Sequence, residues 1–95
     1  MTTYKLRFHT LALSEWQQLD TSVREPFKKK LAERLLTPRV PSAALHGMPD
    51  CYKIKLHSVG YRLVYRVDDA DIFVTVIAAG KREKNRVYRS ALQRL

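Results

Sequence analysis

Four cationic side chains share one face of an expected β-hairpin in the middle of this chain. The stretch 51–66 reads CYKIKLHSVGYRLVYR, in which apolar and basic residues alternate on both sides of a turn at 57–60. Successive side chains of a strand point to opposite faces, so one face is apolar and the other cationic. This register places Lys55 opposite Arg62, and like charges across an antiparallel pair are destabilising. We therefore expect the cationic face to bind an anion, most simply a phosphate, through Lys53, Lys55, Arg62 and Arg66.

The chemistry available on this face is charge stabilisation combined with proton transfer by unusual groups. Cleavage of RNA by its own 2'-hydroxyl needs in-line geometry, a base, an acid and stabilisation of the charge on phosphorus. No Asp or Glu is expected there, and the nearest His is His57 in the turn. Crowded cations lower the pKa of Lys or Tyr from about 10.4 or 10. Arg82 and Tyr88 can reach the same face, so the cluster could perform acid and base steps, poorly alone and better with a partner that orders the substrate.

Each of these residues also has a plain structural interpretation. Basic residues that alternate along a strand most often mark a solvent face. Tyr88 is more simply a helix residue packed at the sheet edge, Cys51 a small strand residue, and the run 28–30 a solvated helix face. Four adjoining cations without an interleaved acid are harder to dismiss, because the arrangement is costly unless it is used.

Composition indicates one small basic domain, residues 1–95. The chain has 95 residues, a formal charge of +9 and a pI near 10.1, and residues 51–95 carry ten Lys and Arg against four Asp and Glu. Such a field attracts nucleic acid. A single Cys and three scattered His provide no set of metal ligands, and we expect neither a metal nor another cofactor. Without an apolar run approaching ~18 residues, we expect a soluble cytoplasmic protein that does not engage a membrane.

Two helices are expected after a first strand. Thr3–His9 alternates in the manner of a half-buried strand. Thr10 can cap a first helix that turns Glu15 to water, and the S-x-x-E sequence at 22–25 resembles a capping box for a second helix that runs to Leu36. We expect these helices to pack antiparallel against each other on one face of a sheet.

The second half supplies the rest of the sheet. A loop at 37–50, pinned by Leu45 and Met48, precedes the hairpin, and 68–71 form a turn. The apolar run 72–79 predicts an interior strand that ends at Gly80, and a short helix with few apolar anchors, which we expect to fray or move, ends the tail. The fold class is therefore α+β: a small, mostly antiparallel four-stranded sheet with two N-terminal helices on one face, the other face open and basic, and a short C-terminal helix.

Several strings of the chain closely resemble the RelE toxins of bacterial toxin–antitoxin pairs. They are GMPDCYKIKL at 47–56, GYRLVYRV at 60–67, GKRE at 80–83 and VY at 87–88, and the similarity runs in register from SEWQQLD near the start to the last residues. The resemblance implies the RelE/ParE-like fold, which is also microbial-ribonuclease-like. His46 and His57 replace arginines usual in the family, which puts the phosphate or rRNA contacts of the loops in doubt more than the reaction.

The resemblance also implies a function. A RelE-like toxin is a ribosome-dependent endoribonuclease that enters the A site of the 70S ribosome, cuts the mRNA codon there, leaves a 2',3'-cyclic phosphate and so inhibits translation. It is neutralised by a RelB-like antitoxin, and operator DNA is bound only through the toxin–antitoxin complex. The family's active-site positions fall on Lys53, Lys55, Arg62, Arg82 and Tyr88. Further contacts with mRNA or 16S rRNA are expected from Arg66, Lys81, Lys84, Arg86 and Arg89.

Two other functions remain open from the sequence. A ParE-like toxin of the same fold would inhibit DNA gyrase and would not need the cationic cluster. A nucleic-acid-binding module without catalysis would use the cluster only to hold phosphates. Cleavage on translating ribosomes and gyrase supercoiling separate the three.

Overall fold

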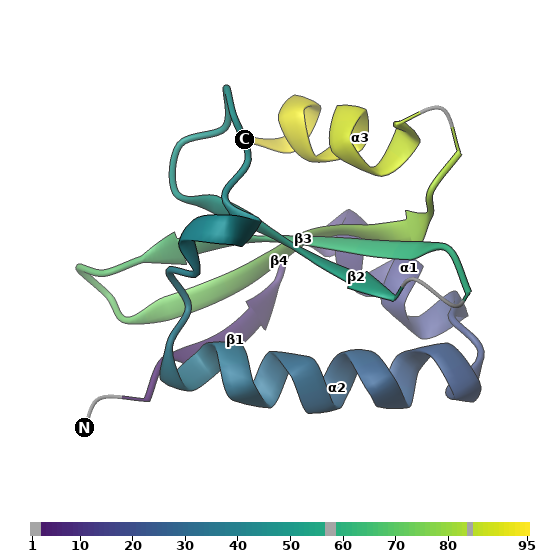
Figure 1. Ribbon diagram of the computed structural model, residues 1–95, viewed down its shortest axis with the longest axis horizontal. Helices are drawn as coiled ribbons and strands as arrows, with labels where there is room; N and C mark the ends of the chain where they lie inside the picture. The colour runs from purple at the N-terminus through teal and green to yellow at the C-terminus, as the bar shows by residue number, and fades with distance from the viewer. Residues whose placement is uncertain (1–2, 57–58, 84) are drawn as a thin grey trace.

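Helices pack on both faces of one mixed four-stranded sheet (Figure 1). The computed structural model describes residues 3–56, 59–83 and 85–95. In chain order the elements are β1 (Lys5–Phe8), α1 (Thr10–Gln18), α2 (Thr21–Leu36), the 3-10 helix η1 (Pro41–Ala43), β2 (Cys51–Leu56), β3 (Tyr61–Asp68), β4 (Phe73–Lys81) and α3 (Arg86–Arg94).

The sheet has the strand order β1-β4-β3-β2. β2 and β3 form the expected antiparallel hairpin, with Lys55 opposite Arg62 and Leu56 opposite Tyr61. β4 pairs antiparallel with β3, and β1 pairs parallel with β4. The predicted α+β class with a mostly antiparallel sheet is therefore confirmed. β2 is an edge strand, so one of its long sides is not paired with another strand of the sheet.

α1 and α2 cover one face of the sheet (Figure 1). Ala12 and Phe27 are fully buried there against Leu63 and Tyr65. Each helix packs mainly on its own part of the sheet, α1 on β4 and α2 on β2, instead of chiefly on the other helix. The ring of Trp16 lies 6.4 Å from that of Phe27 and connects the two helices.

The helix caps differ from the sequence prediction by one or two residues. His9 precedes α1 and its Nδ1 accepts a hydrogen bond from the N–H of Leu11 at 3.1 Å, so Thr10 is the first helical residue and not the cap. Asp20 accepts a bond from the N–H of Ser22 at 3.0 Å. The predicted capping box at 22–25 is therefore wrong, because an aspartate two residues earlier already accepts from this amide.

The second face of the sheet is not open, contrary to the expectation. α3 lies across it (Figure 1), and its Val87 and Ala91 are buried against Val64 and Ile77. These apolar residues of β3 and β4 are unfavourable in water, and the amphipathic tail covers them. Charged side chains of this face lie beyond the apolar residues that α3 covers, on one side toward β2 and the end of β4, and on the other around Arg66 and Arg7.

The ends of β4 also shift from the predicted positions. Ile72 has a φ of 60° and belongs to the turn, so the strand begins at Phe73. It continues past Gly80 to Lys81, because Gly80 pairs with Arg62 and Lys81 with Tyr61. The extra two residues bring Arg82 to the end of the hairpin.

Arg39 connects the loop at 37–50 to the sheet. Its Nη2 lies 2.7 Å from the carboxylate of Asp69 and its Nη1 lies 3.0 Å from that of Asp50. Tyr4 donates to the same Asp69 at 2.5 Å. Met48 is buried and Leu45 packs beside it, as expected for the residues that pin the loop. Within the described ranges, no helix is both long enough and apolar enough to cross a membrane.

Candidate active site

The hairpin and the end of β4 bring four predicted site residues to one margin of the sheet. Lys53 and Lys55 extend from the edge strand β2, and Arg62 lies directly opposite Lys55 on β3. The N–H of Arg82 donates to the carbonyl of Gly60 at 2.8 Å, which fixes the residue after β4 beside the hairpin turn. Hairpin register and strand length, both set by the local sequence, therefore assemble this cationic cluster of Lys53, Lys55, Arg62 and Arg82.

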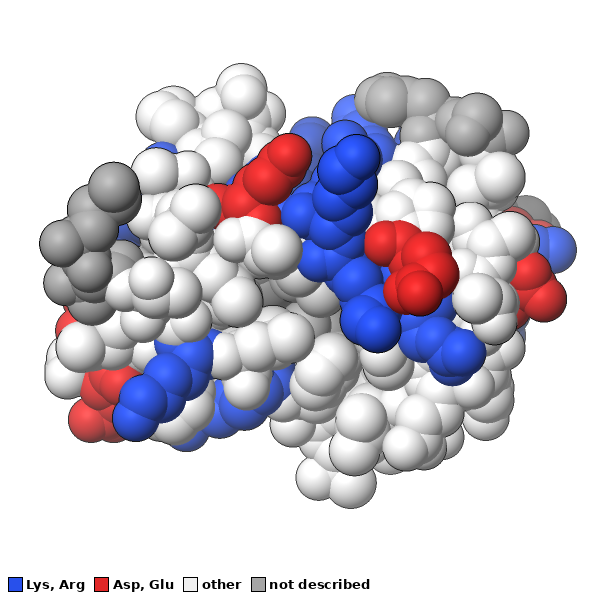
Figure 2. All heavy atoms as spheres, turned by 90° about the horizontal axis from the view of Figure 1, so that it is seen from below, with Lys and Arg blue, Asp and Glu red and all other residues white. Residues whose placement is uncertain are grey.

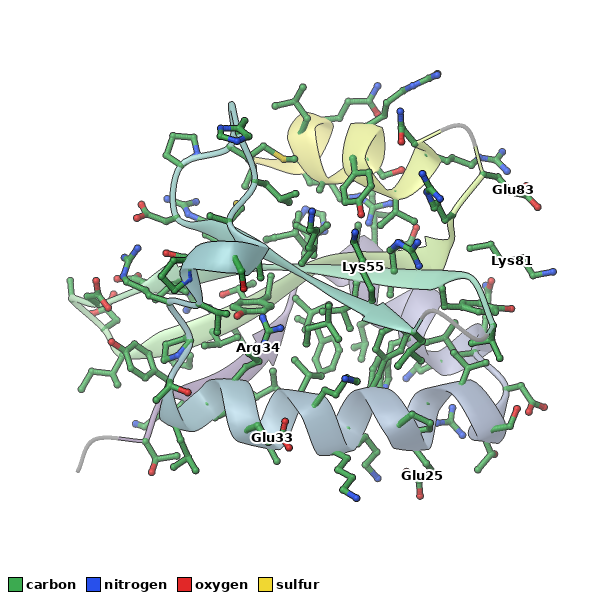
Figure 3. All side chains as sticks on the ribbon, in the orientation of Figure 1. Glu25, Glu33, Arg34, Lys55, Lys81 and Glu83 are labelled. Carbon is green, nitrogen blue, oxygen red and sulfur yellow. The ribbon has the colours of Figure 1, made fainter. Side chains whose placement is uncertain are left out.

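Lys55 experiences the charge of the whole cluster. Its pKa is lowered, first by the ammonium of Lys53, then by partial burial, and then by the guanidinium groups of Arg62 and Arg82. Each neighbouring cation disfavours the protonated amine. Lys55 points from β2 toward the side of the sheet that α3 covers (Figure 3). It is therefore a lysine whose neutral form is easier to reach than that of an ordinary surface lysine.

Arg62 is the buried member of the cluster. It is only 5% exposed, its Nη1 donates to the carbonyl of Tyr61 at 2.9 Å, and its Nε is buried without a partner. Among the described residues, no carboxylate forms an ion pair with it. Burying a charge without a counterion is unfavourable. The sequence predicted that Arg62 faces the site, but it could not show this burial, which depends on the packing around the strand.

Tyr88 lies on α3 and is partly buried against the core cluster that contains Val64, Ile77, Val87 and Ala91. The packing interpretation of Tyr88 is therefore correct as far as it goes. The same helix covers the sheet face toward which Lys55 points.

The remaining predicted contacts are more scattered. Arg66 is exposed four residues along β3 from Arg62, about 13 Å away at the rise of a strand. It lines a separate cleft of about 220 Å³ with Arg7 and Arg94, and is not part of the cationic cluster. Lys81 points outward from the end of β4, away from Lys55 (Figure 3). Arg86 and Arg89 are exposed on α3, and Lys84 lies outside the described residues, as does His57.

The sequence analysis missed two basic residues beside the cluster. Lys30 and Arg34 line a hollow of about 300 Å³ together with Ser42, Lys53 and Lys55; we call it the α2–β2 hollow. Their spacing of four places both on one side of α2. That spacing was the available signal, but no local pattern indicates that this side of α2 meets the edge of β2.

The run 28–30 is exposed, as expected for a solvated helix face. Figure 2 shows Lys and Arg side chains in a band across the face that carries α2, with acidic side chains on either side. Lys28 belongs to a mixed-charge surface, because its Nζ lies 3.5 Å from the carboxylate of Glu25. Only Lys30 of the three lines the α2–β2 hollow.

Cys51 is unsuited to nucleophilic chemistry. It is 1% exposed, and burial raises the pKa of its thiol, so the reactive thiolate is disfavoured. Nor do three His, Cys, Asp or Glu side chains come together as possible metal ligands anywhere in the described part of the chain. What the margin of the sheet offers is a set of cations that can bind a phosphate, stabilise added negative charge on it and, at Lys55, exchange a proton.

Comparison with known proteins gives one family and close relatives. The family model described as the ParE toxin of type II toxin–antitoxin systems, parDE, matches residues 6–86. The mRNA interferase toxin RelE of Escherichia coli strain K12 is 54% identical over 92 residues, which is 97% of each chain.

Solved structures agree with the sequence matches. A double arginine-to-alanine mutant of the E. coli toxin RelE in the free state superimposes with a TM-score of 0.91 at 53% identity, over 98% of each chain. The toxin in the intact E. coli RelBE toxin–antitoxin complex superimposes with a TM-score of 0.82 at 56% identity, over 85% of this chain and 99% of that one.

Proposed function

The chain belongs to the RelE toxins within the ParE toxin family of type II toxin–antitoxin systems, and from this premise we propose that it cleaves mRNA in the A site of the 70S ribosome. The relative that is 54% identical over nearly its whole length is named an mRNA interferase. The observation within this structure that carries the proposal is the buried guanidinium of Arg62, without an acid among the described residues, next to a lysine of lowered pKa. Such a cluster suits a polyanionic substrate that brings its own phosphate.

The reaction uses a nucleophile that the RNA supplies. The 2'-oxygen loses its proton and bonds to the adjacent phosphorus, the bond from phosphorus to the 5'-oxygen breaks, and the departing 5'-oxygen takes up a proton. The products are a 2',3'-cyclic phosphate end and a free 5'-hydroxyl. Arg62 and Arg82 hold the phosphate and stabilise its developing charge. Lys53 and Lys55 share stabilisation and proton transfer, and the lowered pKa of Lys55 supports it as the proton-exchanging lysine.

The ribosome supplies what this cluster lacks. Lysine and tyrosine are weak general acids and bases at neutral pH. A substrate held in line by the A site removes much of the entropic barrier, so a modest set of catalytic groups suffices. Tyr88 orients or stacks on a base, and Arg66, Lys81, Lys84, Arg86 and Arg89 are the proposed additional contacts with mRNA or 16S rRNA. We place the reaction in the cytoplasm, where translation occurs.

A RelB-like antitoxin neutralises the toxin in this proposal. The E. coli relative has been solved in a complex named RelBE toxin–antitoxin. Operator DNA is bound by the toxin–antitoxin complex and not by the toxin alone. A gyrase-inhibiting function, the alternative within the same family, has no need of the acid-free cationic cluster.

The decisive experiment incubates the purified protein with translating ribosomes and maps new mRNA 3' ends. We expect cuts within the A-site codon, and an Arg82→Ala variant that is folded but inactive. Lys29→Ala, which removes one exposed charge from α2 away from the cluster, is the matched control and should remain active. Cleavage by Arg82→Ala at the wild-type rate would contradict the proposal, and inhibition of gyrase supercoiling without cleavage would replace it.

A further inference from the structure

The α2–β2 hollow is a second concentration of positive charge that the four-residue cluster does not account for. Lys30 and Arg34 approach it from α2, Lys53 and Lys55 from β2, and Ser42 from η1. Among the described residues that line it, none is Asp or Glu. Lys30 and Arg34 line this hollow of about 300 Å³ without a carboxylate, so their charges repel one another and are better satisfied by a bound anion.

The acidic residues of α2 do not compensate this charge. Glu25 extends below α2, Glu33 lies on the side of the helix that faces the viewer, and Arg34 reaches up from the helix toward β2 (Figure 3). Glu25 is paired with Lys28, on the outer surface. Of the described α2 residues, the two that line the hollow, Lys30 and Arg34, are both basic.

Arg34 is held in position by neutral groups. Its Nη1 donates to the carbonyl of Lys53 at 3.2 Å and to the hydroxyl of Tyr65 at 2.8 Å, and that hydroxyl donates to the carbonyl of Pro38 at 2.7 Å. Both of these hydrogen bonds are donated by Nη1 and orient the guanidinium. Neither bond involves Nε or Nη2. A guanidinium fixed in this way presents a planar pair of donors suited to a phosphate.

We propose that the α2–β2 hollow binds a second phosphate of the RNA strand, adjacent to the phosphate that is cut. The proposal rests on the proposed function, because Lys53 and Lys55 belong to both sites. Their side chains lie about 7 Å apart along β2, which suits neighbouring phosphates of an extended strand. The RNA backbone then runs from Arg62 and Arg82 past the two lysines of the edge strand to Lys30, Arg34 and the hydroxyl of Ser42.

This path has a consequence for the edge of the sheet. β2 is the outer strand, and an exposed edge is open to pairing with another chain. Arg34 already occupies the Lys53 carbonyl, and the bridge between Ala44 and Tyr52 covers the edge one residue earlier. The backbone groups of β2 next to the hollow are thus partly covered by Arg34 and by the bridge to Ala44. In the proposal, an RNA backbone lies along this edge in place of another strand.

The test measures binding and not cleavage. Oligoribonucleotides carrying a single 2'-deoxy sugar at the cut position cannot react, so their affinity for the free protein can be titrated. A dinucleotide is compared with two longer ligands that add one phosphate at the 5' or at the 3' end. We expect one of these additions to tighten binding to the wild-type protein by about twofold to fivefold, as an exposed charge pair contributes.

Lys30→Ala should abolish that gain and also lower the slope of log affinity against log salt by about 0.7, the value for one contact with a single strand. The matched control is Lys29→Ala, which removes the same charge from the neighbouring residue of α2 and should keep the gain. Equal losses in both variants would indicate a diffuse field and overturn the proposal, as would a wild-type protein that does not distinguish the ligands. Because no cleavage is involved, inactivity on ribosomes would refute the proposed function without deciding this one.

Discussion

Lys55 and Arg62 face each other as directly paired residues of the β2–β3 hairpin. Two cations in this position disfavour the strand pairing that brings them together, yet this hairpin carries three of the four residues of the cationic cluster. Arg62 contributes to the lowered pKa of Lys55, after Lys53 and partial burial, and Arg62 itself is buried with its Nε unpartnered. Both properties can be measured separately from cleavage.

Removing the charge of Lys53 should raise the pKa of Lys55. Lys53 is the largest cause of the lowering, so Lys53→Met relieves the strongest repulsion and the Lys55 pKa moves back toward about 10.4. Titration of the Lys55 side-chain carbon by NMR measures it. Arg66→Met removes a charge from the far end of β3 and should leave the titration nearly unchanged. A Lys55 pKa that does not move in Lys53→Met would show that the ammonium of Lys53 is not the main cause of the shift.

The direction of the shift also determines how this group affects stability. A lysine whose folded pKa lies below its unfolded pKa binds more protons when the chain is unfolded. Its unfavourable effect is fully present below the folded pKa and disappears as the pH rises through the interval between the two values. The cationic cluster therefore lowers stability at neutral pH, and binding of a phosphate relieves it.

Two mostly buried arginines should respond in opposite ways to the same substitution. Arg62 is 5% exposed and without an ion-pair partner among the described residues, so Arg62→Met should leave stability unchanged or raise it by about 1 to 2 kcal/mol. Arg94, whose side chain is 13% exposed, is paired with Glu15, so Arg94→Met should cost about 1–3 kcal/mol. Urea unfolding measures both. A large loss of stability in Arg62→Met would mean that this guanidinium is structurally needed, and the argument for an anion site would fail.

Acid should weaken the connection between the loop at 37–50 and the sheet. The pKa of Asp69 is lowered, first by the hydrogen bond from Tyr4 and then by that from Arg39. A lowered folded pKa gives stabilisation that is present above the unfolded value of about 3.9 and is lost as the pH falls through the folded value. Urea unfolding between about pH 6 and about pH 2 should therefore show a shallower decline for Asp69→Asn than for the wild-type protein.

Asp71→Asn, a change of an exposed carboxylate in the same turn, is the control for that decline. It should follow the wild-type curve. If Asp69→Asn and the wild-type protein lose stability in parallel, the Arg39 network does not titrate as the structure indicates.

The hairpin could be predicted in detail from the sequence because its signals are local. Alternation with period two, broken by a turn at 57–60, sets strand, face and register together. The caps of α1 and α2 could not be placed as well, because His9 and Thr10, or Asp20 and Ser22, are competing acceptors within two residues. The strands and helices therefore followed from pattern, and the errors in the caps lie where neighbouring residues offer similar hydrogen bonds.

The unpredicted parts of the site depend on contacts between distant residues. The burial of Arg62 requires packing around β3, and the α2–β2 hollow requires one side of α2 to meet β2, 19 residues beyond Arg34 at Lys53. Glu15 was expected to face water on the basis of its helix alone. In the structure it accepts from Arg94, 79 residues away, and from the N–H of Ala79. The spacing of apolar and polar residues along one helix does not indicate contacts with residues so far away in the sequence.

That last contact gives a prediction for α3, the helix that carries Tyr88. Arg94 donates to both carboxylate oxygens of Glu15, at 2.8 and 3.0 Å, and to the carbonyl of Ile77 at 2.8 Å. It adds a charged anchor to the apolar contacts of Val87 and Ala91, which by themselves are few. Arg94→Gln should therefore loosen α3 more than it affects the sheet. Hydrogen exchange should become faster in α3 amides, by about 5- to 150-fold for a loss of about 1–3 kcal/mol, while the amides of β3 and β4 keep their protection.

Cleavage on ribosomes should fall in the same variant, because Tyr88 is then positioned only part of the time. Gln93→Ala changes an exposed residue of the same helix turn and should alter neither exchange nor cleavage. If Arg94→Gln speeds exchange in α3 without slowing cleavage, the docked position of α3 is not the one used in the reaction, and Tyr88 has only its packing role. If exchange in α3 is unchanged, the apolar contacts suffice to hold the helix, and the pair with Glu15 does not secure it.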